Sequence, residues 1–185
     1  MKDTEPITKS VELRSGSTRA KVSPNGALVT NFTVGGIEVL MPDQICNIGG
    51  KPKKRGGVPI FNIAGLQHQK QGIFKLDIDQ HGFVRNKKWK VEDHTNDQVT
   101  LSLTDDVETR EQFPYAFHTE MKVTLKEKGI RWNWSTKNNG RLDDRMNADM
   151  PSADALHPYV SISKKKLQPI LLALIQKRTG VNQAV

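Results

Sequence analysis

The sequence predicts an all-β protein built as an antiparallel β-sandwich. Three observations carry this prediction. Apolar and polar side chains alternate along several segments after Trp89, as expected for strands with one buried face and one wet face. These segments follow one another at short spacing, with turn residues between them. Several antiparallel strands at this spacing suggest a sandwich, and no repeat or low-complexity segment stands out.

The first elements expected are short strands over residues 27–33 and 37–40, with turns at Pro24–Gly26 and at Gly35-Gly36. The next stretch, Gly49–Pro59, is rich in Gly, Pro and Lys and is predicted to be irregular. Residues 60–80 show no clean period. We expect loop and short strand there, around a functional surface.

The clearest strands follow. A turn of hairpin length at Lys126–Gly129 joins two of them. The alternating apolar positions are Val99, Leu101 and Leu103, then Phe117, Met121, Val123 and Leu125 with Thr119 in register, then Ile130, Trp132 and Trp134. Residues 167–176 (LQPILLALIQ) differ: they predict a helix that Pro169 opens and that ends near Gly180. We therefore divide the chain into a β-domain over 1–160 and a basic and apolar tail over 161–185, either helical or foreign to the domain.

Composition limits the function classes. The chain has 185 residues, of which 36% are hydrophobic and 26% charged, as is typical of a soluble globular protein. Its N-terminus lacks the apolar core of a signal peptide, and the longest apolar run, Ile170–Ile175, is too short to cross a bilayer. Cys46 is the single cysteine, so no internal disulfide can form and a cytoplasmic location is expected, with no membrane contact. The net charge of +8 favours anionic partners.

Two of the five histidines stand out. His118 shares a predicted strand face with polar residues, and His94 and His68 lie in polar segments, so all three are interpreted as surface side chains. His81 lies in QHGFVR, where a glycine lets the backbone turn or a ligand approach. His157 lies in ALHPYV, where the following proline restricts its backbone to extended geometry, as suits an oriented general acid. Each alone is more often structural, and no spacing predicts a metal site.

Arg55 begins RGGVPI. Gly56 and Gly57 are expected to leave backbone N–H groups open to approach, and the planar guanidinium of Arg55 suits a phosphate. KPKKRGG could also be a nucleic-acid patch, but it lacks interleaved aromatic residues and runs into an apolar segment, so no nucleic-acid partner is expected.

Taken in order, RGGVPI, QHGFVR with Trp89 soon after, TREQFPYAF and MPSADALHPYV resemble the aldose 1-epimerase superfamily. Within it they are most similar to the hexose-6-phosphate mutarotases, or glucose-6-phosphate 1-epimerases, from about Arg14 to Val160. The resemblance implies a sandwich of the galactose mutarotase-like type and the interconversion of α and β anomers of a phosphorylated hexose without a cofactor. It also implies that His157 is the general acid, that Arg55, Gln80 and Arg85 hold the sugar phosphate, and that His81 lines the pocket.

The sequence also departs from the family pattern. The family's catalytic glutamate and a substrate-binding aspartate lie well beyond the HPY motif, whereas no Asp or Glu follows Asp154 here. Val160 replaces a frequent aromatic residue, and Ile60–Ile63 replaces a segment that usually contains Phe-Pro. The sequence therefore predicts an incomplete, C-terminally truncated sandwich with unpaired strand edges. It leaves open a non-catalytic sugar-phosphate-binding module.

Overall fold

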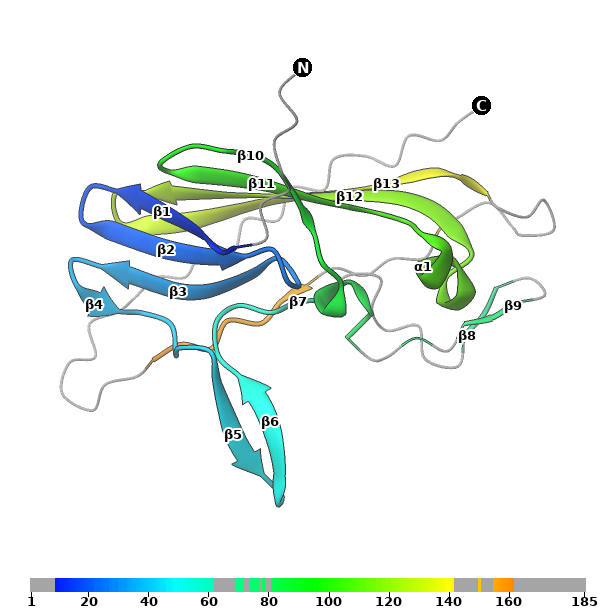
Figure 1. The fold of residues 1–185 in the computed structure, drawn as a ribbon, viewed down its shortest axis with the longest axis horizontal. Helices are drawn as coiled ribbons and strands as arrows, with labels where there is room; N and C mark the ends of the chain where they lie inside the picture. Colours follow the sequence, from blue (N-terminus) through cyan, green and yellow to red (C-terminus); the bar gives the residue numbers. More distant parts are fainter. Residues whose placement is uncertain are drawn as a thin grey trace.

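The computed structural model describes residues 9–61, 69–71, 74–76, 78, 81–141, 150 and 155–161. Its body consists of two four-stranded antiparallel sheets that lie one over the other (Figure 1). In each sheet every strand pairs with its neighbour in the sequence. The first sheet has the order β1 (Val11–Ser15), β2 (Thr18–Ser23), β3 (Leu28–Val34), β4 (Ile37–Glu38). The second has the order β10 (Lys90–His94), β11 (Gln98–Thr104), β12 (Tyr115–Lys126), β13 (Gly129–Arg141).

The core lies between the two sheets, where β1 and β2 contact β11 and β12. Alternate residues of each strand point into it because the side-chain period of a strand is two. The fully or almost fully buried side chains include Leu13 and Val22 of the first sheet and Leu101, Met121 and Val123 of the second. The hydroxyl of Thr18 also donates to the carbonyl oxygen of Glu127, which ties β2 to the second sheet. The predicted antiparallel sandwich is confirmed.

The alternation that predicts β11, β12 and β13 is also confirmed. The two longest strands, β12 and β13, pair from Tyr115↔Arg141 to Lys126↔Gly129 around the predicted turn. Trp132 and Trp134 face Val123 and Met121 across this pair but are only half-buried, because β13 lies at the edge of the sheet among the described strands.

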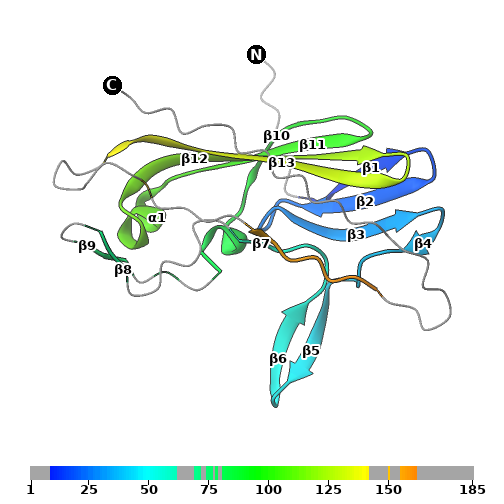
Figure 2. The same ribbon diagram turned by 180° about the vertical axis from the view of Figure 1, so that it is seen from behind.

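The segment from Gly49 to Pro59 corrects the prediction of irregular structure. β5 (Gln44–Ile48) and β6 (Lys51–Arg55) form a hairpin that projects away from the two sheets (Figures 1 and 2). Its two-residue loop is Gly49-Gly50, with φ of 61° and 75°, and positive φ at both positions is the mark of a type I′ turn. The sequence conceals this hairpin because most of its side chains are exposed, so no apolar alternation marks its strands.

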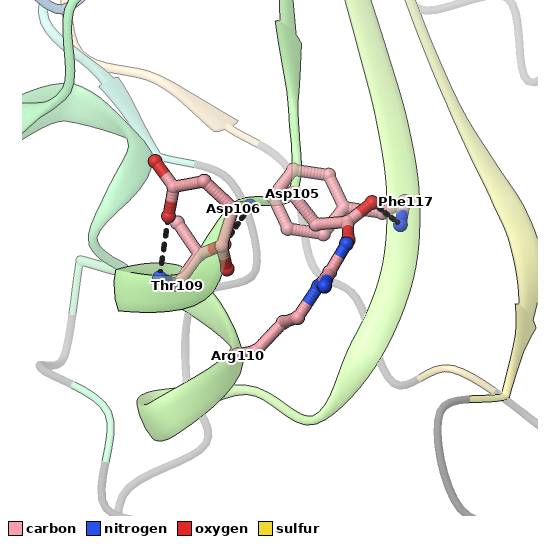
Figure 3. A network of polar contacts seen from close by, with 5 residues as sticks. All are labelled: Asp105, Asp106, Thr109, Arg110 and Phe117. Carbon is pink, nitrogen blue, oxygen red and sulfur yellow. Dashed lines mark hydrogen bonds and ion pairs between the residues drawn. The ribbon is translucent and has the colours of Figure 1, made fainter.

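The short helix α1 (Val107–Gln112) and β1 were not predicted. Asp106 caps α1: its carboxylate accepts a hydrogen bond from the N–H of Thr109 (2.7 Å), and the Thr109 hydroxyl accepts one from the N–H of Asp106 (2.7 Å) (Figure 3). The neighbouring Asp105 accepts from Arg110 Nε (2.7 Å) and from the N–H of Phe117 (2.9 Å). These bonds fasten α1 to the start of β12.

Short elements lie beside the two sheets: β7 (Ile60–Phe61), β8 (Gln69–Gln71), β9 (Phe74–Leu76), the 3-10 turn η1 (Val84–Asn86) and β14 (Ala155–Leu156). This agrees with the loop and short strand expected over residues 60–80, as far as these are described. The helix predicted over 167–176, and the tail after Ser161, lie outside the described residues. No helix in the described part of the chain is long and apolar enough to span a membrane.

Candidate functional site

Two segments far apart in the sequence lie side by side at one end of the first sheet. β14 pairs antiparallel with β7, with Ala155 opposite Phe61 and Leu156 opposite Ile60. The pairing continues past the strand ends, because the N–H of His157 donates to the Pro59 carbonyl (3.1 Å) and the N–H of Tyr159 to that of Gly57 (2.9 Å). The HPY segment is therefore held along the GGVPIF segment by backbone hydrogen bonds.

Strand alternation explains which side chains face outward here. Ile60 is fully buried, and Leu156 packs against the hydrophobic core. His157 is exposed, and Tyr159, two residues further on, projects from the same face of the extended chain. The proline after His157 helps to keep this stretch extended, as the sequence predicts.

Three side chains contact the ring of Phe61, and Tyr159 stacks on one of them; we call these five residues the Phe61 cluster. The His81 imidazole stacks on the Phe61 ring, with centroids 4.3 Å apart and planes at 27°. The His157 imidazole meets the same ring edge-on at 5.8 Å, and Tyr159 stacks on His157 at 4.7 Å. The Arg85 guanidinium carbon lies over the Phe61 ring, 5.7 Å from its centroid, within the range of a cation–π interaction.

The loop carrying His81 and Arg85 is fixed from several sides. Trp89 is buried, and its indole N–H donates to the Val84 carbonyl (3.0 Å), closing the loop across η1. The turn between β2 and β3 packs against the same loop: Gly26 N–H donates to the Lys87 carbonyl (2.8 Å), and Trp89 N–H donates to that of Pro24 (2.8 Å). A Cβ built on Gly26 would overlap the carbonyl of Arg85, so glycine is required for this close approach.

The structure corrects the expectation for the paired glycines. Both are buried, and the N–H of Gly57 donates to the Met41 carbonyl (2.8 Å), so it is not open to a ligand. Gly57 has φ of 62°, and a Cβ there would overlap the carbonyl of Val29. Gly57 therefore allows the chain to pass close to β3.

The other two predicted site residues are Arg55 and Gln80. Arg55 ends β6 at the base of the hairpin, half-buried, and its Nη1 donates to the carbonyl of Lys54 (2.9 Å). It is linked to the Phe61 cluster through the backbone, by the bond from Tyr159 to Gly57. Gln80 lies outside the described residues. The structure thus brings His81, Arg85 and His157 together, with Arg55 two residues from the bonded Gly57.

The remaining histidines lie elsewhere. His118 projects from the outer face of β12, half-buried, where its Nδ1 lies 3.0 Å from the Thr104 hydroxyl. His94 ends β10 and is exposed, and His68 is outside the described residues. Among the described residues, no group of three His, Cys, Asp or Glu side chains could hold a metal ion.

Sequence reasoning missed Phe61 and Tyr159. Tyr159 carries a usable signal, because it lies two residues from His157 on an extended segment and therefore shares its face. Phe61 carries none, since its position opposite Ala155 depends on pairing between distant segments.

Comparison with known proteins identifies the family. The family model of aldose 1-epimerase matches residues 9–180, which is nearly the whole chain. The chain belongs to the aldose 1-epimerase family. No curated protein matches this family member at a significant level.

Solved structures agree with the fold. A galactose mutarotase-like protein from Lactobacillus casei superposes with a TM-score of 0.69 at 18% identity, over 84% of this chain and 51% of that one. The Slr1438 protein from Synechocystis gives 0.69 at 25% identity, over 88% and 58%. A galactose mutarotase related enzyme from Lactobacillus acidophilus gives 0.59 at 22% identity, over 70% and 43%. This member of the family therefore has the galactose mutarotase-like fold and spans about half the length of the solved structures it matches.

Proposed function

We propose that the protein binds a phosphorylated hexose, such as glucose 6-phosphate, at the Phe61 cluster and interconverts its α and β anomers. The observation that carries this proposal is the meeting of His81, Arg85 and His157 on one aromatic ring, although they come from distant segments. Membership of the aldose 1-epimerase family supports an isomerase or epimerase acting on sugars. The phosphate and the residue roles are our own assignments.

The reaction divides among these groups as follows. His157 donates a proton to the ring oxygen while a base, a role that we assign to none of the five cluster residues, removes the proton of the anomeric hydroxyl. The bond between the anomeric carbon and the ring oxygen breaks, and the anomeric carbon becomes an aldehyde. Rotation of the aldehyde and reclosure with the proton transfers reversed give the other anomer.

Two arginines favour a phosphorylated sugar as the substrate. Arg85 of the Phe61 cluster and Arg55, which we assign to the same substrate, have planar guanidinium groups that match the oxygens of a phosphate. Gln80 and His81 are assigned to the same substrate, with His81 hydrogen-bonding to sugar hydroxyls. A neutral sugar needs no such pair of cations, so phosphate recognition is the simplest use of both arginines.

The alternative is a sugar-phosphate-binding module without catalysis. The observation in its favour is that the five residues of the Phe61 cluster include no Asp or Glu that could act as the base. Without an efficient base, ring opening is expected to be slower by about 100-fold or more.

The experiment follows anomer exchange of glucose 6-phosphate by NMR with the protein and with a His157→Gln variant. Acceleration over buffer that is lost in the variant supports catalysis by His157. No acceleration over buffer refutes the enzymatic proposal and leaves the binding module to be tested by calorimetry.

Binding is tested with glucose 6-phosphate and glucose on wild type, Arg85→Ala and Arg85→Lys. We expect glucose 6-phosphate to bind more tightly than glucose, and Arg85→Ala to remove most of that difference. Equal affinity for the two sugars would refute the phosphate assignment.

A further inference from the structure

We propose that Phe61 is the positioning residue of this site, whose ring fixes the side chains of His81, Arg85 and His157 relative to one another. The effect of Phe61 on catalysis rests on the proposed function. Its effect on the histidine side chains can be measured separately, on the free protein.

The ring of Phe61 is itself held in place by the backbone. Phe61 belongs to β7, where it lies opposite Ala155, and its neighbour Ile60 is fully buried in the core. Phe61 therefore projects from a segment that is anchored on its other face. Phe61 is half-buried and thus less exposed than the two imidazoles that contact its ring.

The imidazoles, in contrast, are exposed. The side chains of His81 and His157 are both exposed, and an exposed side chain without fixed contacts samples several rotamers. His81 stacks on the Phe61 ring at 4.3 Å with the planes 27° apart, whereas His157 meets it nearly perpendicularly at 78°. These stacked and edge-to-face arrangements are the two that aromatic pairs prefer, so one ring restricts both imidazoles.

Tyr159 and Arg85 complete the restriction. Tyr159 stacks on His157 with an interplanar angle of 11°, so His157 has aromatic contacts with both Phe61 and Tyr159. Arg85 places its guanidinium over the Phe61 ring, an arrangement that an aliphatic side chain in place of Phe61 cannot support. The acid, the pocket histidine and the phosphate-binding arginine of the proposed site thus share one neighbour.

Phe61 has no titratable group and no hydrogen-bonding atom in its side chain. It can affect the reaction only through its neighbours or through contact with the sugar. A small displacement of positioned groups can lower a rate by about 100-fold, which makes the arrangement of the rings worth testing directly.

The test compares Phe61→Leu and Phe61→Met, which remove the ring, with Phe61→Tyr, which keeps it. The first measurement is the NMR spectrum of the imidazole protons in the free protein, assigned with His81→Gln and His157→Gln. We expect the His81 and His157 signals to shift in the Leu and Met variants and to stay near their wild-type positions in the Tyr variant. The His94 and His118 signals, which lie elsewhere, should not move in any variant.

The second measurement is anomer exchange, or affinity for glucose 6-phosphate if exchange is absent. We expect the Leu and Met variants to lose about tenfold to 100-fold and the Tyr variant to recover most of the loss. Thermal unfolding of each variant checks that it is folded, and two ring-removing variants are used because either one could fail to fold.

The outcomes separate this inference from the proposed function. Unchanged imidazole signals in a folded Leu or Met variant overturn the positioning role, whatever the activity. Shifted signals with unchanged exchange and affinity also overturn it. Wild-type protein that binds glucose 6-phosphate without accelerating exchange refutes only the enzymatic proposal, and the affinities then decide the role of Phe61. Protein that neither binds nor converts the sugar phosphate refutes both.

Discussion

At Gly57 the chain passes so close to β3 that a side chain would overlap the carbonyl of Val29. The same residue donates its N–H to the Met41 carbonyl and accepts from the N–H of Tyr159, so it joins the segment after β4 to the HPY segment. Its φ of 62° is a conformation that favours glycine. One small residue thus determines how closely the site segment approaches the core.

Gly57→Ala should therefore destabilise the protein more than Gly35→Ala. Both positions have positive φ, 62° and 58°, but a Cβ on Gly35 meets no atom within 4 Å. We expect a loss of about 1 kcal/mol in unfolding free energy for Gly35→Ala, from the backbone conformation alone. For Gly57→Ala we expect a loss of about 3 kcal/mol, because overlap of the new Cβ with the backbone of β3 adds to the cost of the backbone conformation. Urea denaturation measures both, and equal losses would show that β3 can move aside.

At the scale of the element, α1 shows how a very short helix is stabilised. Isolated helices of this length do not persist in water, so its end bonds and packing must hold it. Asp106 and Thr109 satisfy each other's backbone N–H groups, and Thr109 is fully buried. The hydrogen bond from the Thr109 N–H, above all, holds the pKa of Asp106 below its usual value.

Replacing Asp106 tests this cap. Asp106→Ala should lower the unfolding free energy by about 1 kcal/mol, and Asp106→Asn by much less, because Asn is also a good cap. The pKa of Asp106 is lower in the folded protein than in the unfolded chain, where it is about 3.9. The charged carboxylate therefore stabilises the fold fully above the unfolded pKa, and this stabilisation is lost as the pH falls through the folded pKa. The difference between wild type and Asp106→Asn should thus shrink in acid. If chemical denaturation gave a difference in unfolding free energy that did not change with pH, the charge of the carboxylate would not contribute to the cap.

The β5–β6 hairpin is an element of the opposite kind. It projects from the body, and its Ile45 side chain is 69% exposed, so it contributes little to the core (Figure 2). Its register is set by the Gly49-Gly50 turn and by cross-strand pairs from Gln44↔Arg55 to Ile48↔Lys51.

Shortening the hairpin should leave the fold intact. Replacing residues 47–52 with Asn-Gly joins the paired residues Cys46 and Lys53 by another type I′ turn and keeps Arg55 in place. We expect the unfolding free energy to change by less than about 1 kcal/mol, since the removed side chains are exposed. A larger loss in thermal or urea unfolding would mean that the hairpin contacts the body.

For the whole molecule, stability depends on the contact between the two sheets. Met121 of β12 is fully buried in this contact, whereas its neighbour Lys122 projects from the other face of the sheet. One strand therefore offers a matched pair of positions, one in the core and one outside it.

Met121→Ala should cost about 2–5 kcal/mol of unfolding free energy through lost burial and the cavity that it leaves. Lys122→Ala, the control on the same strand, should change the value by no more than about 0.5 kcal/mol. Calorimetry or urea unfolding compares the two variants. Similar losses at both positions would contradict the sandwich as the main source of stability.

The sequence by itself determined the fold class, the β11–β12–β13 strands and the turns around residues 24–26 and 35–36. Each of these depends on local pattern: alternation follows from the strand period, and turns follow from the freedom of glycine and the fixed φ of proline. The sequence also selected His81, Arg85 and His157 as site candidates from their motifs. Their roles stay predictions, as does the tail over 161–185.

Only the tertiary structure decided where these groups meet. β7 pairs with β14 across nearly a hundred positions of sequence, and no local pattern records such a pairing. That pairing brings His157 to the ring of Phe61, on which His81 also stacks, and gives Tyr159 its place beside His157. A sequence pattern reports which face of a strand is buried. The partner of that strand is chosen by packing and backbone hydrogen bonds between distant segments.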